Sequence, residues 1–301
     1  MRTVLTQPAQ RERADASLLS LMLAVCGTLL FWSSAFPAIK VALRSYSPLH
    51  LAAFRFMVAA GVFGIYLLVR RRPLPDRGDW PALFIMGFLG FSFYNVALNF
   101  GQQKVTAGAA SFLINTVPIF SVILAVLLLG ERLKPIGWLG VAISFTGASL
   151  LALGEGETGM LSRHAFYILA AAASASCCVI LQKNYLRKYP AIDLTAYITI
   201  AAALQLLPFT IGLREEIASA PRVATLAVIY LGIIPAALAY SLWAFVLSHW
   251  PASRTVSFLY LAPALTCIIS WFWLSEIPSN VSILGGIIAL SGVVLVNTKG
   301  K

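Results

Sequence analysis

Residues 107–150 read AGAASFLINTVPIFSVILAVLLLGERLKPIGWLGVAISFTGASL and return near the C-terminus as ASRTVSFLYLAPALTCIISWFWLSEIPSNVSILGGIIALSGVVL, residues 252–295. The two stretches align without a gap, 145 residues apart. The alignment pairs Pro118 with Pro263, Glu131 with Glu276, Gly140 with Gly285 and Gly147 with Gly292. Two long apolar segments therefore occur twice in the same order, which indicates a chain built from two copies of one unit.

The composition of the whole chain is that of a membrane protein. Of 301 residues, 59% are hydrophobic and only 11% are charged, whereas an average soluble domain is about 25% charged. The net charge of +11 would suggest nucleic-acid binding in a soluble protein, but here the charges lie in short loops between apolar segments, where they set membrane topology. We therefore expect membrane lipid and a small-molecule substrate as partners, and no nucleic acid.

Ten segments have the roughly 20 mostly apolar residues that a membrane-spanning helix needs. They cover residues 17–38, 48–69, 80–101, 107–129, 134–153, 164–185, 191–212, 223–246, 254–274 and 279–297. The predicted fold class is an all-α membrane protein with ten transmembrane helices. We divide the chain into a cytoplasmic tail at 1–16, a first five-helix repeat at 17–155 and a second at 160–298.

The Lys and Arg residues predict how the repeats are oriented. With the N-terminus in the cytoplasm, fifteen of them fall on the cytoplasmic side and six on the other, and Arg55 lies within a helix. This bias favours both termini inside. Because five is an odd number, the second repeat then enters the membrane upside down. Inverted repeats are a hallmark of secondary transporters, whose substrate site lies near the midplane between the halves.

The fifth and tenth segments share a pattern of small residues. Gly137, Gly140, Ser144 and Gly147 correspond to Ser282, Gly285, Ala289 and Gly292. Each set forms one stripe on a helix face and allows close approach of the backbones. We expect these two helices to pack as a scaffold.

Acidic residues are absent from the centres of the apolar segments. Glu131, Asp193 and Glu276 lie nearest to them, each at a helix end. Carriers coupled to protons or sodium usually use an intramembrane carboxylate, so the sequence favours facilitated, downhill transport. Glu131 and Glu276 are interpreted as interfacial residues or as caps on the N-terminus of the helix that follows each of them.

Two further features each leave two interpretations open. Arg55 lies about 10 Å inside the second segment at 1.5 Å per residue. It is a possible anion contact in the transport path, or it bonds structurally to a neighbouring helix or snorkels to the interface. The matched prolines Pro118 and Pro263 each remove a backbone hydrogen bond and are predicted hinges, with packing kinks as the alternative.

Polar and aromatic side chains at depth either bond across helices or line a hydrated path. Asn115 and Tyr260 are symmetry mates, three residues before the matched prolines. The predicted substrate-binding residues are Trp32, Ser34, Tyr94, Asn95, Asn99, Asn115, Ser176, Tyr240, Trp243, Tyr260 and Trp271. No catalytic, metal or cofactor residues are predicted. GFSF at 90–93 lacks the trailing Gly of a nucleophile elbow, so an intramembrane enzyme is a remote alternative, and a channel would lack a charged ring.

Four stretches resemble one family: FWSSAFPAIK at 31–40, SPLHLAAFR at 47–55, ALNFGQQKVTAGAASFLINTVPIFSVILAVLLLGERL at 97–133 and WLSEIPSNVSILGGIIALSGVVLVN at 273–297. They are similar to the EamA-type branch of the drug/metabolite transporter superfamily, over essentially the whole chain. The resemblance implies that helices 1, 3, 4, 6, 8 and 9 surround a central cavity, with 5 and 10 at the side. Within the family the chain looks most like bacterial amino-acid exporters, including those for aromatic amino acids.

The expected function is export of amino acids and related small metabolites across a bacterial inner membrane, by facilitated transport and alternating access. A zwitterion needs a few polar contacts and an apolar or aromatic wall, which the predicted residues supply. The alternative is a proton-coupled multidrug or metabolite exporter, although cationic drugs would favour an acidic cavity residue. We expect a monomer or a weak dimer and no cofactor.

Overall fold

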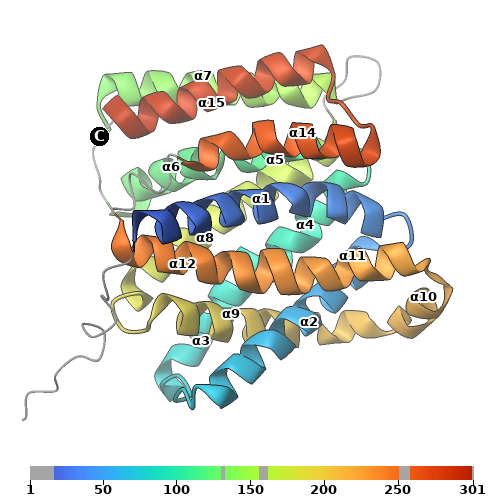
Figure 1. Cartoon of the computed structure of the whole chain (residues 1–301). Helices are drawn as coiled ribbons and strands as arrows, with labels where there is room; N and C mark the ends of the chain where they lie inside the picture. The colour runs from blue at the N-terminus through green and yellow to red at the C-terminus, as the bar shows by residue number, and fades with distance from the viewer. Residues whose placement is uncertain (1–16, 130–132, 156–161, 251–257, 300–301) are drawn as a thin grey trace, which may run out of the picture.

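The structure is a computed structural model that describes residues 17–129, 133–155, 162–250 and 258–299. Nine helices in these ranges are long and apolar enough to cross a membrane, and the shorter apolar helix Phe258–Leu274 makes the tenth. All ten predicted segments are thereby confirmed as helices. The helices run side by side as one bundle, and α1 begins at the end of the bundle where α15 ends (Figure 1). We call this the terminal end and the opposite one the Lys40 end.

The first half of the bundle contains five spans. They are α1 (Leu18–Ala42), α2 (Pro48–Val69), the continuous series η2 (Arg77–Asp79), α3 (Trp80–Gly87), η3 (Phe88–Ser92) and α4 (Phe93–Gln102), the pair α5 (Ala107–Ile114) and α6 (Val117–Leu129), and α7 (Pro135–Gly154). Ser17, Ser47 and Thr106 begin α1, α2 and α5 because each side chain accepts a backbone N–H of the first turn.

The second half repeats this order. Its spans are α8 (Arg163–Tyr185), α9 (Ala191–Leu206) with η4 (Leu207–Thr210), the series α11 (Arg222–Ile233), η5 (Ile234–Leu238) and α12 (Ala239–His249), the pair η6 (Phe258–Leu261) and α14 (Ala262–Leu274), and α15 (Asn280–Lys299). A short helix that the sequence did not predict, α10 (Leu213–Ser219), joins η4 to α11.

Four spans of the described chain have interruptions that match between the halves. The third and eighth spans each contain a five-residue π-helix, η3 and η5. The fourth span breaks between α5 and α6, just before Pro118, and the ninth begins with the 3-10 turn η6, just before Pro263. A π-turn or a proline leaves backbone groups without their helical partners, so these four spans present irregular backbone at corresponding depths.

The scaffold formed by α7 and α15 is confirmed. A Cβ on Gly147 would lie 2.2 Å from the backbone nitrogen of Ala289, and one on Gly140 would lie 2.9 Å from the carbonyl oxygen of Gly292. Residues early in α7 therefore meet residues late in α15, so the two mates run antiparallel, as an inverted repeat requires. Their stripe of small residues lets the two backbones touch along one side of the bundle (Figure 1).

Replacement of Gly147 by Leu is expected to separate these two helices and to lower the free energy of unfolding by about 1–3 kcal/mol, the usual penalty for overpacking. Thermal unfolding in detergent measures this change. Gly61 on α2 is the matched control, because a Cβ there meets no atom within 4 Å. An equal loss of stability in Gly61→Leu would contradict the assignment of the α7–α15 contact as a close backbone interface.

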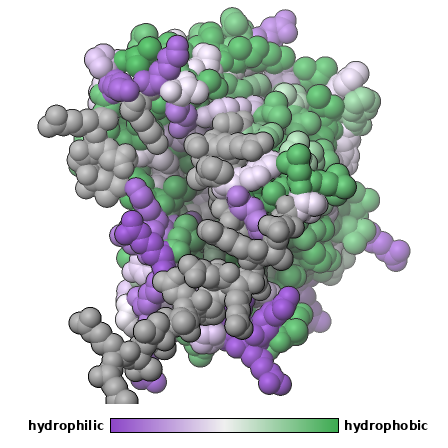
Figure 2. Space-filling model, turned by 60° about the vertical axis from the view of Figure 1, so that its left-hand side comes forward, coloured by the Kyte–Doolittle hydropathy of each residue, from purple (hydrophilic) through white to green (hydrophobic). Residues whose placement is uncertain are grey.

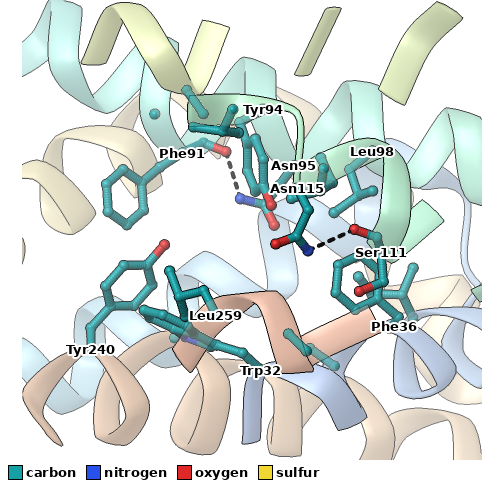
Figure 3. Close-up of a pocket in the computed structure, with 18 of the residues that line it drawn as sticks. Trp32, Phe36, Phe91, Tyr94, Asn95, Leu98, Ser111, Asn115, Tyr240 and Leu259 are labelled. Carbon is teal, nitrogen blue, oxygen red and sulfur yellow. Dashed lines mark hydrogen bonds between the residues drawn. The ribbon is translucent and has the colours of Figure 1, made fainter. Parts of the chain in front are cut away.

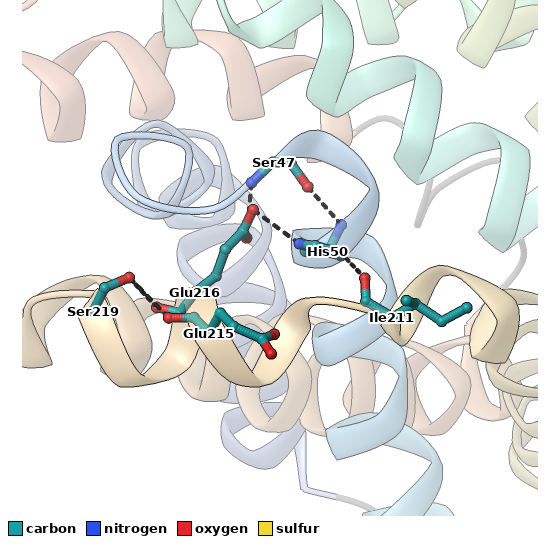
Figure 4. A network of polar contacts seen from close by, with 6 residues as sticks. All are labelled: Ser47, His50, Ile211, Glu215, Glu216 and Ser219. Atoms are coloured by element: carbon teal, nitrogen blue, oxygen red, sulfur yellow. Dashed lines mark hydrogen bonds and ion pairs between the residues drawn. The ribbon is translucent and has the colours of Figure 1, made fainter.

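The Lys40 end carries a polar network that fixes α10 (Figure 4). Glu216 on α10 accepts the backbone N–H of Ser47 at 3.1 Å and lies 2.9 Å from Nδ1 of His50, whose Nε2 lies 2.9 Å from the carbonyl oxygen of Ile211. Both ring nitrogens thus face oxygens that only accept hydrogen bonds. Through the backbone of Ser47 and the ring of His50, Glu216 thereby links α10 to the start of α2.

The terminal end carries charged loops, and hydrophilic residues gather there while the flank of the bundle is largely hydrophobic (Figure 2). Lys188 pairs with Asp76 at 2.6 Å and also with Asp79. Hydrogen bonds to Asp76 and then Asp79 raise the pKa of Lys188. While both carboxylates are ionised, the contribution of this cluster to stability is complete below the ordinary lysine pKa of about 10.4 and is lost as the pH rises through the raised value.

Candidate functional site

A cavity of about 280 Å³ lies between the two halves of the bundle. We call it the central cavity. Spans 1 to 4 of the first half and spans 6, 8 and 9 of the second contribute to its wall. The lining residues are Trp32, Ala35, Phe36, Ile39, Arg55, Phe56, Gly90, Phe91, Tyr94, Asn95, Leu98, Ser111, Ile114, Asn115, Val117, Pro118, Ala175, Ala236, Tyr240, Leu259 and Ala262.

Arg55 is the one charged residue among the described residues that line this cavity. It is 8% exposed, and its Nη1 donates to Oδ1 of Asn95 at 2.8 Å. The amide of Asn95 is itself held, because Nδ2 donates to the carbonyl oxygen of Phe91 at 2.8 Å. That carbonyl belongs to the π-helix η3. The irregular backbone of the third span thus orients Asn95, and Asn95 orients the guanidinium. This bond agrees with the interpretation of Arg55 as a structural residue that bonds a neighbouring helix. Its position in the cavity wall is equally compatible with a contact to an anionic substrate.

An aromatic wall faces this cation. Trp32 packs against Tyr240 and Trp243 with ring centroids 5.2 Å and 5.3 Å apart, and Tyr240 lies 5.6 Å from Phe91. The indole of Trp32 donates to the carbonyl oxygen of Pro235 at 3.2 Å, within the second π-helix η5. The two matched π-helices therefore supply the acceptors that fix Asn95 on one side and Trp32 on the other.

Neutral polar groups complete the cavity. Asn115 stands at the break between α5 and α6, where its Nδ2 donates to the carbonyl oxygen of Ser111 at 2.9 Å and its Oδ1 faces the cavity (Figure 3). The side chains of Tyr94 and Tyr240 also point inward (Figure 3). Ser176 on α8 donates to the carbonyl oxygen of Val117 at 2.9 Å and so supports the same break from outside.

The structure brings together about half of the residues predicted from sequence. Trp32, Arg55, Tyr94, Asn95, Asn115, Pro118 and Tyr240 line the cavity. The others lie elsewhere: Ser34 bonds Tyr230, Asn99 donates to the Pro48 carbonyl, Ser176 supports the break, Trp243 stands behind Trp32, Tyr260 accepts from Asn297, and Trp271 is 54% exposed on the outside of the bundle. Pro263 also lies outside the wall, at the start of α14.

Sequence reasoning missed the apolar part of the wall. Phe36, Ile39, Gly90, Phe91, Ile114 and Leu259 resemble any other residue of an apolar helix. One signal was available, because Gly90 and Pro235 stand 145 residues apart and both fall where a span becomes π-helical. A matched pair of helix-weakening residues indicates a break near a binding site.

Of the two interpretations of Glu276, the cap on the helix that follows it is wrong. Glu276 does not cap α15, the helix that follows it. Its Oε2 accepts the backbone N–H of Ala107 at 2.9 Å, and its Oε1 lies 3.3 Å from Nζ of Lys40. It therefore caps α5 in the other half of the molecule, and it joins α1, α5 and α14 at the Lys40 end. Its mate Glu131 lies outside the described residues.

Comparison with known proteins agrees with this architecture. The model of the EamA-like transporter family matches twice, over residues 19–153 and 162–298, so each half of the chain carries one copy of the family's unit. The chain belongs to the EamA-like transporter family. It is thus a transporter and a multi-pass membrane protein, and the resemblance seen in its sequence is confirmed.

Two curated relatives and one solved structure extend the comparison. An uncharacterized transporter of Bacillus subtilis, YdfC, is 40% identical over 87% of this chain and 86% of its own length. A "Probable terminal-alkyne amino-acid exporter" of Streptantibioticus cattleyicolor is 33% identical over 90% of this chain and 91% of its own. A crystal structure covering 93% of the chain and 96% of its own length has a TM-score of 0.60 at 21% identity, a likeness of fold alone.

Proposed function

We propose that the protein exports amino acids and related small metabolites across a bacterial inner membrane by alternating access. The observation that carries the proposal is the central cavity, in which one fixed cation and several neutral polar groups face an aromatic wall between two inverted halves. The name of the S. cattleyicolor relative, an amino-acid exporter, points to the same substrate class.

An amino acid fits the cavity in one orientation. Its carboxylate meets the guanidinium of Arg55, which Asn95 holds in place, because arginine binds carboxylates through charge-assisted, often bidentate hydrogen bonds. Its ammonium group meets neutral acceptors such as Oδ1 of Asn115. Its side chain lies against Trp32 and Tyr240. A cavity of about 280 Å³ is slightly smaller than the usual site for a drug-sized ligand, about 300–1,000 Å³, which suits a small metabolite.

The transport cycle requires each end of the cavity to open in turn. The breaks before Pro118 and Pro263 supply matched hinges in the fourth and ninth spans, and α7 with α15 stays as a rigid scaffold. No acidic residue lines the cavity among those described, so the cycle is a facilitated uniport. The terminal end faces the cytoplasm in this proposal, because the Lys and Arg bias places both termini inside.

Liposomes that contain the purified protein and labelled phenylalanine are expected to release the phenylalanine at least tenfold faster than protein-free liposomes loaded in the same way. Phenylalanine tests the aromatic wall and the carboxylate site together. The rate should not change when a pH gradient is imposed, because a uniport moves no proton.

Two results would contradict the proposal. Release of a cationic dye, without release of any amino acid, would favour the multidrug alternative. Proton movement that tracks substrate would show coupled transport instead of uniport. Protein-free liposomes and liposomes with heat-denatured protein give the background leak.

A further inference from the structure

No acidic side chain among the described lining residues balances the charge of Arg55, whose guanidinium carbon lies 5.9 Å from the centre of the Phe56 ring. Its Nη1 bonds a neutral amide, its Nε has no hydrogen-bond partner within the described part of the chain, and no acid is present among the described lining residues. Arginine stays protonated in proteins, and a buried charge without a counter-ion is strongly unfavourable. A bound anion would therefore remove a penalty that the empty cavity carries.

The cavity offers no negative charge to an ammonium group among its described lining residues. The polar groups that could receive one, the Asn115 amide oxygen and the hydroxyls of Tyr94 and Tyr240, are all neutral. An ammonium that leaves water for these groups meets no opposite charge, so its desolvation is poorly compensated. A hydroxyl, keto or amide group at the same position needs only a hydrogen bond. The site accordingly requires a carboxylate and merely tolerates a cationic group.

A second cavity, of about 750 Å³, lies at the Lys40 end and is also lined by cationic side chains. We call it the vestibule. Lys40, Arg44, Lys104 and Arg163 line it with a single described acid, Glu276. Both cavities are lined by the end of α1, since Ile39 lines the central cavity and Lys40 lines the vestibule. A cleft lined by one sign of charge raises the local concentration of ions of the other sign, so the vestibule suits an anion in transit.

We propose that the protein carries monocarboxylate anions that have no cationic group, such as 2-hydroxy acids, and that the membrane potential drives them outward. This inference rests on the proposed function, because it uses the same cavity and the same uniport cycle. A uniporter returns to its starting state, so the charge moved per cycle is the charge of the cargo. An interior-negative potential of 100 mV then supports an outward ratio of about 50-fold for a monoanion. A zwitterion gains nothing from it.

The test compares three compounds that share a phenyl ring: phenyllactate as the anion, phenylalanine as the zwitterion and phenethylamine as the cation. Liposomes containing the full-length protein are loaded with each compound, and a potassium gradient with valinomycin sets the potential. Phenyllactate efflux is expected to rise several-fold when the interior becomes negative, with phenylalanine efflux unchanged and phenethylamine at background. Leak is measured in protein-free liposomes at the same potential.

Two variants test whether the efflux of phenyllactate depends on the charge of the central cavity. Arg55→Gln should reduce phenyllactate efflux at least about tenfold, the lower bound for loss of a hydrogen bond to a charged group. Because this variant could also fold poorly, Asn115→Asp provides a gain of function. It adds an acid to the cavity wall. The hydrogen bond from Nδ2 to the Ser111 carbonyl oxygen is lost, but that oxygen still accepts the backbone N–H of residue 115 at 3.1 Å. Asn115→Asp should lower phenyllactate efflux and allow phenethylamine transport.

The outcomes separate this inference from the proposed function. Transport of phenylalanine without phenyllactate would overturn the inference and leave the proposed function in place. Phenyllactate efflux that ignores the potential would also overturn it. Transport of neither phenyllactate nor any amino acid would overturn both the inference and the proposed function. Unchanged selectivity in a folded Asn115→Asp protein would show that the charge of the central cavity does not select the cargo.

Discussion

Replacement of Ala175 by Trp is expected to abolish transport while the bundle stays folded. Ala175 lies on α8 and its side chain lines the central cavity, so an indole there enters empty space instead of a packed core. It would occupy much of the roughly 280 Å³ that a substrate needs. We expect at least a 100-fold loss of phenylalanine efflux in liposomes, with thermal unfolding in detergent little changed.

The matched control is Ala173→Trp, two residues earlier on the same helix. Ala173 lines a separate apolar groove on the flank of the bundle with Phe88, Phe93 and Phe120. A Trp there adds the same bulk to the same helix without entering the central cavity. Equal loss of transport in both variants would show that bulk on α8 acts through folding or helix packing. Full activity of Ala175→Trp would show that the central cavity is not the path.

The ten helices and their inversion could be predicted because each depends on local chemistry. A span needs about 20 apolar residues whatever its neighbours are. The unequal distribution of Lys and Arg between the loops of the two sides can be counted from the sequence alone. The α7–α15 contact was also predictable, because Gly140 and Gly147 recur at the same spacing in Gly285 and Gly292. A stripe of small residues has few uses in a membrane helix other than close packing.

The cavity wall was only partly predictable, because facing the cavity depends on the rotation of each helix. Trp271 and Trp32 are both aromatic residues within apolar helices, yet Trp32 lines the cavity and Trp271 is 54% exposed outside the bundle. Nothing in the local sequence distinguishes them. The bond from Glu276 to Ala107 joins residues 169 positions apart, and no helix-capping pattern in sequence reaches across two halves of a molecule.

The carboxylate of Glu276 has two roles that substitutions can separate, the ion pair with Lys40 and the cap on α5. As an ion-pair partner of Lys40 it is partly exposed, with side-chain exposures of 17% for Lys40 and 22% for Glu276, and such pairs contribute about 0–1 kcal/mol. As the acceptor for the Ala107 N–H it caps α5, and loss of a cap lowers stability by about 0.5–2 kcal/mol. The cap should therefore be the larger contribution.

Four variants distinguish the two roles through thermal unfolding and efflux. Glu276→Gln keeps an acceptor for Ala107 and should behave nearly as wild type. Glu276→Ala loses both contacts and should be clearly less stable. Glu276→Lys should be the most damaged, with transport near background, because it sets a cation against the positive end of the α5 dipole. The double exchange Lys40→Glu with Glu276→Lys restores the ion pair but leaves that cation beside the helix N-terminus, so it should not recover. Recovery of the double variant would mean that the ion pair, and not the cap, holds the three helices together at the Lys40 end.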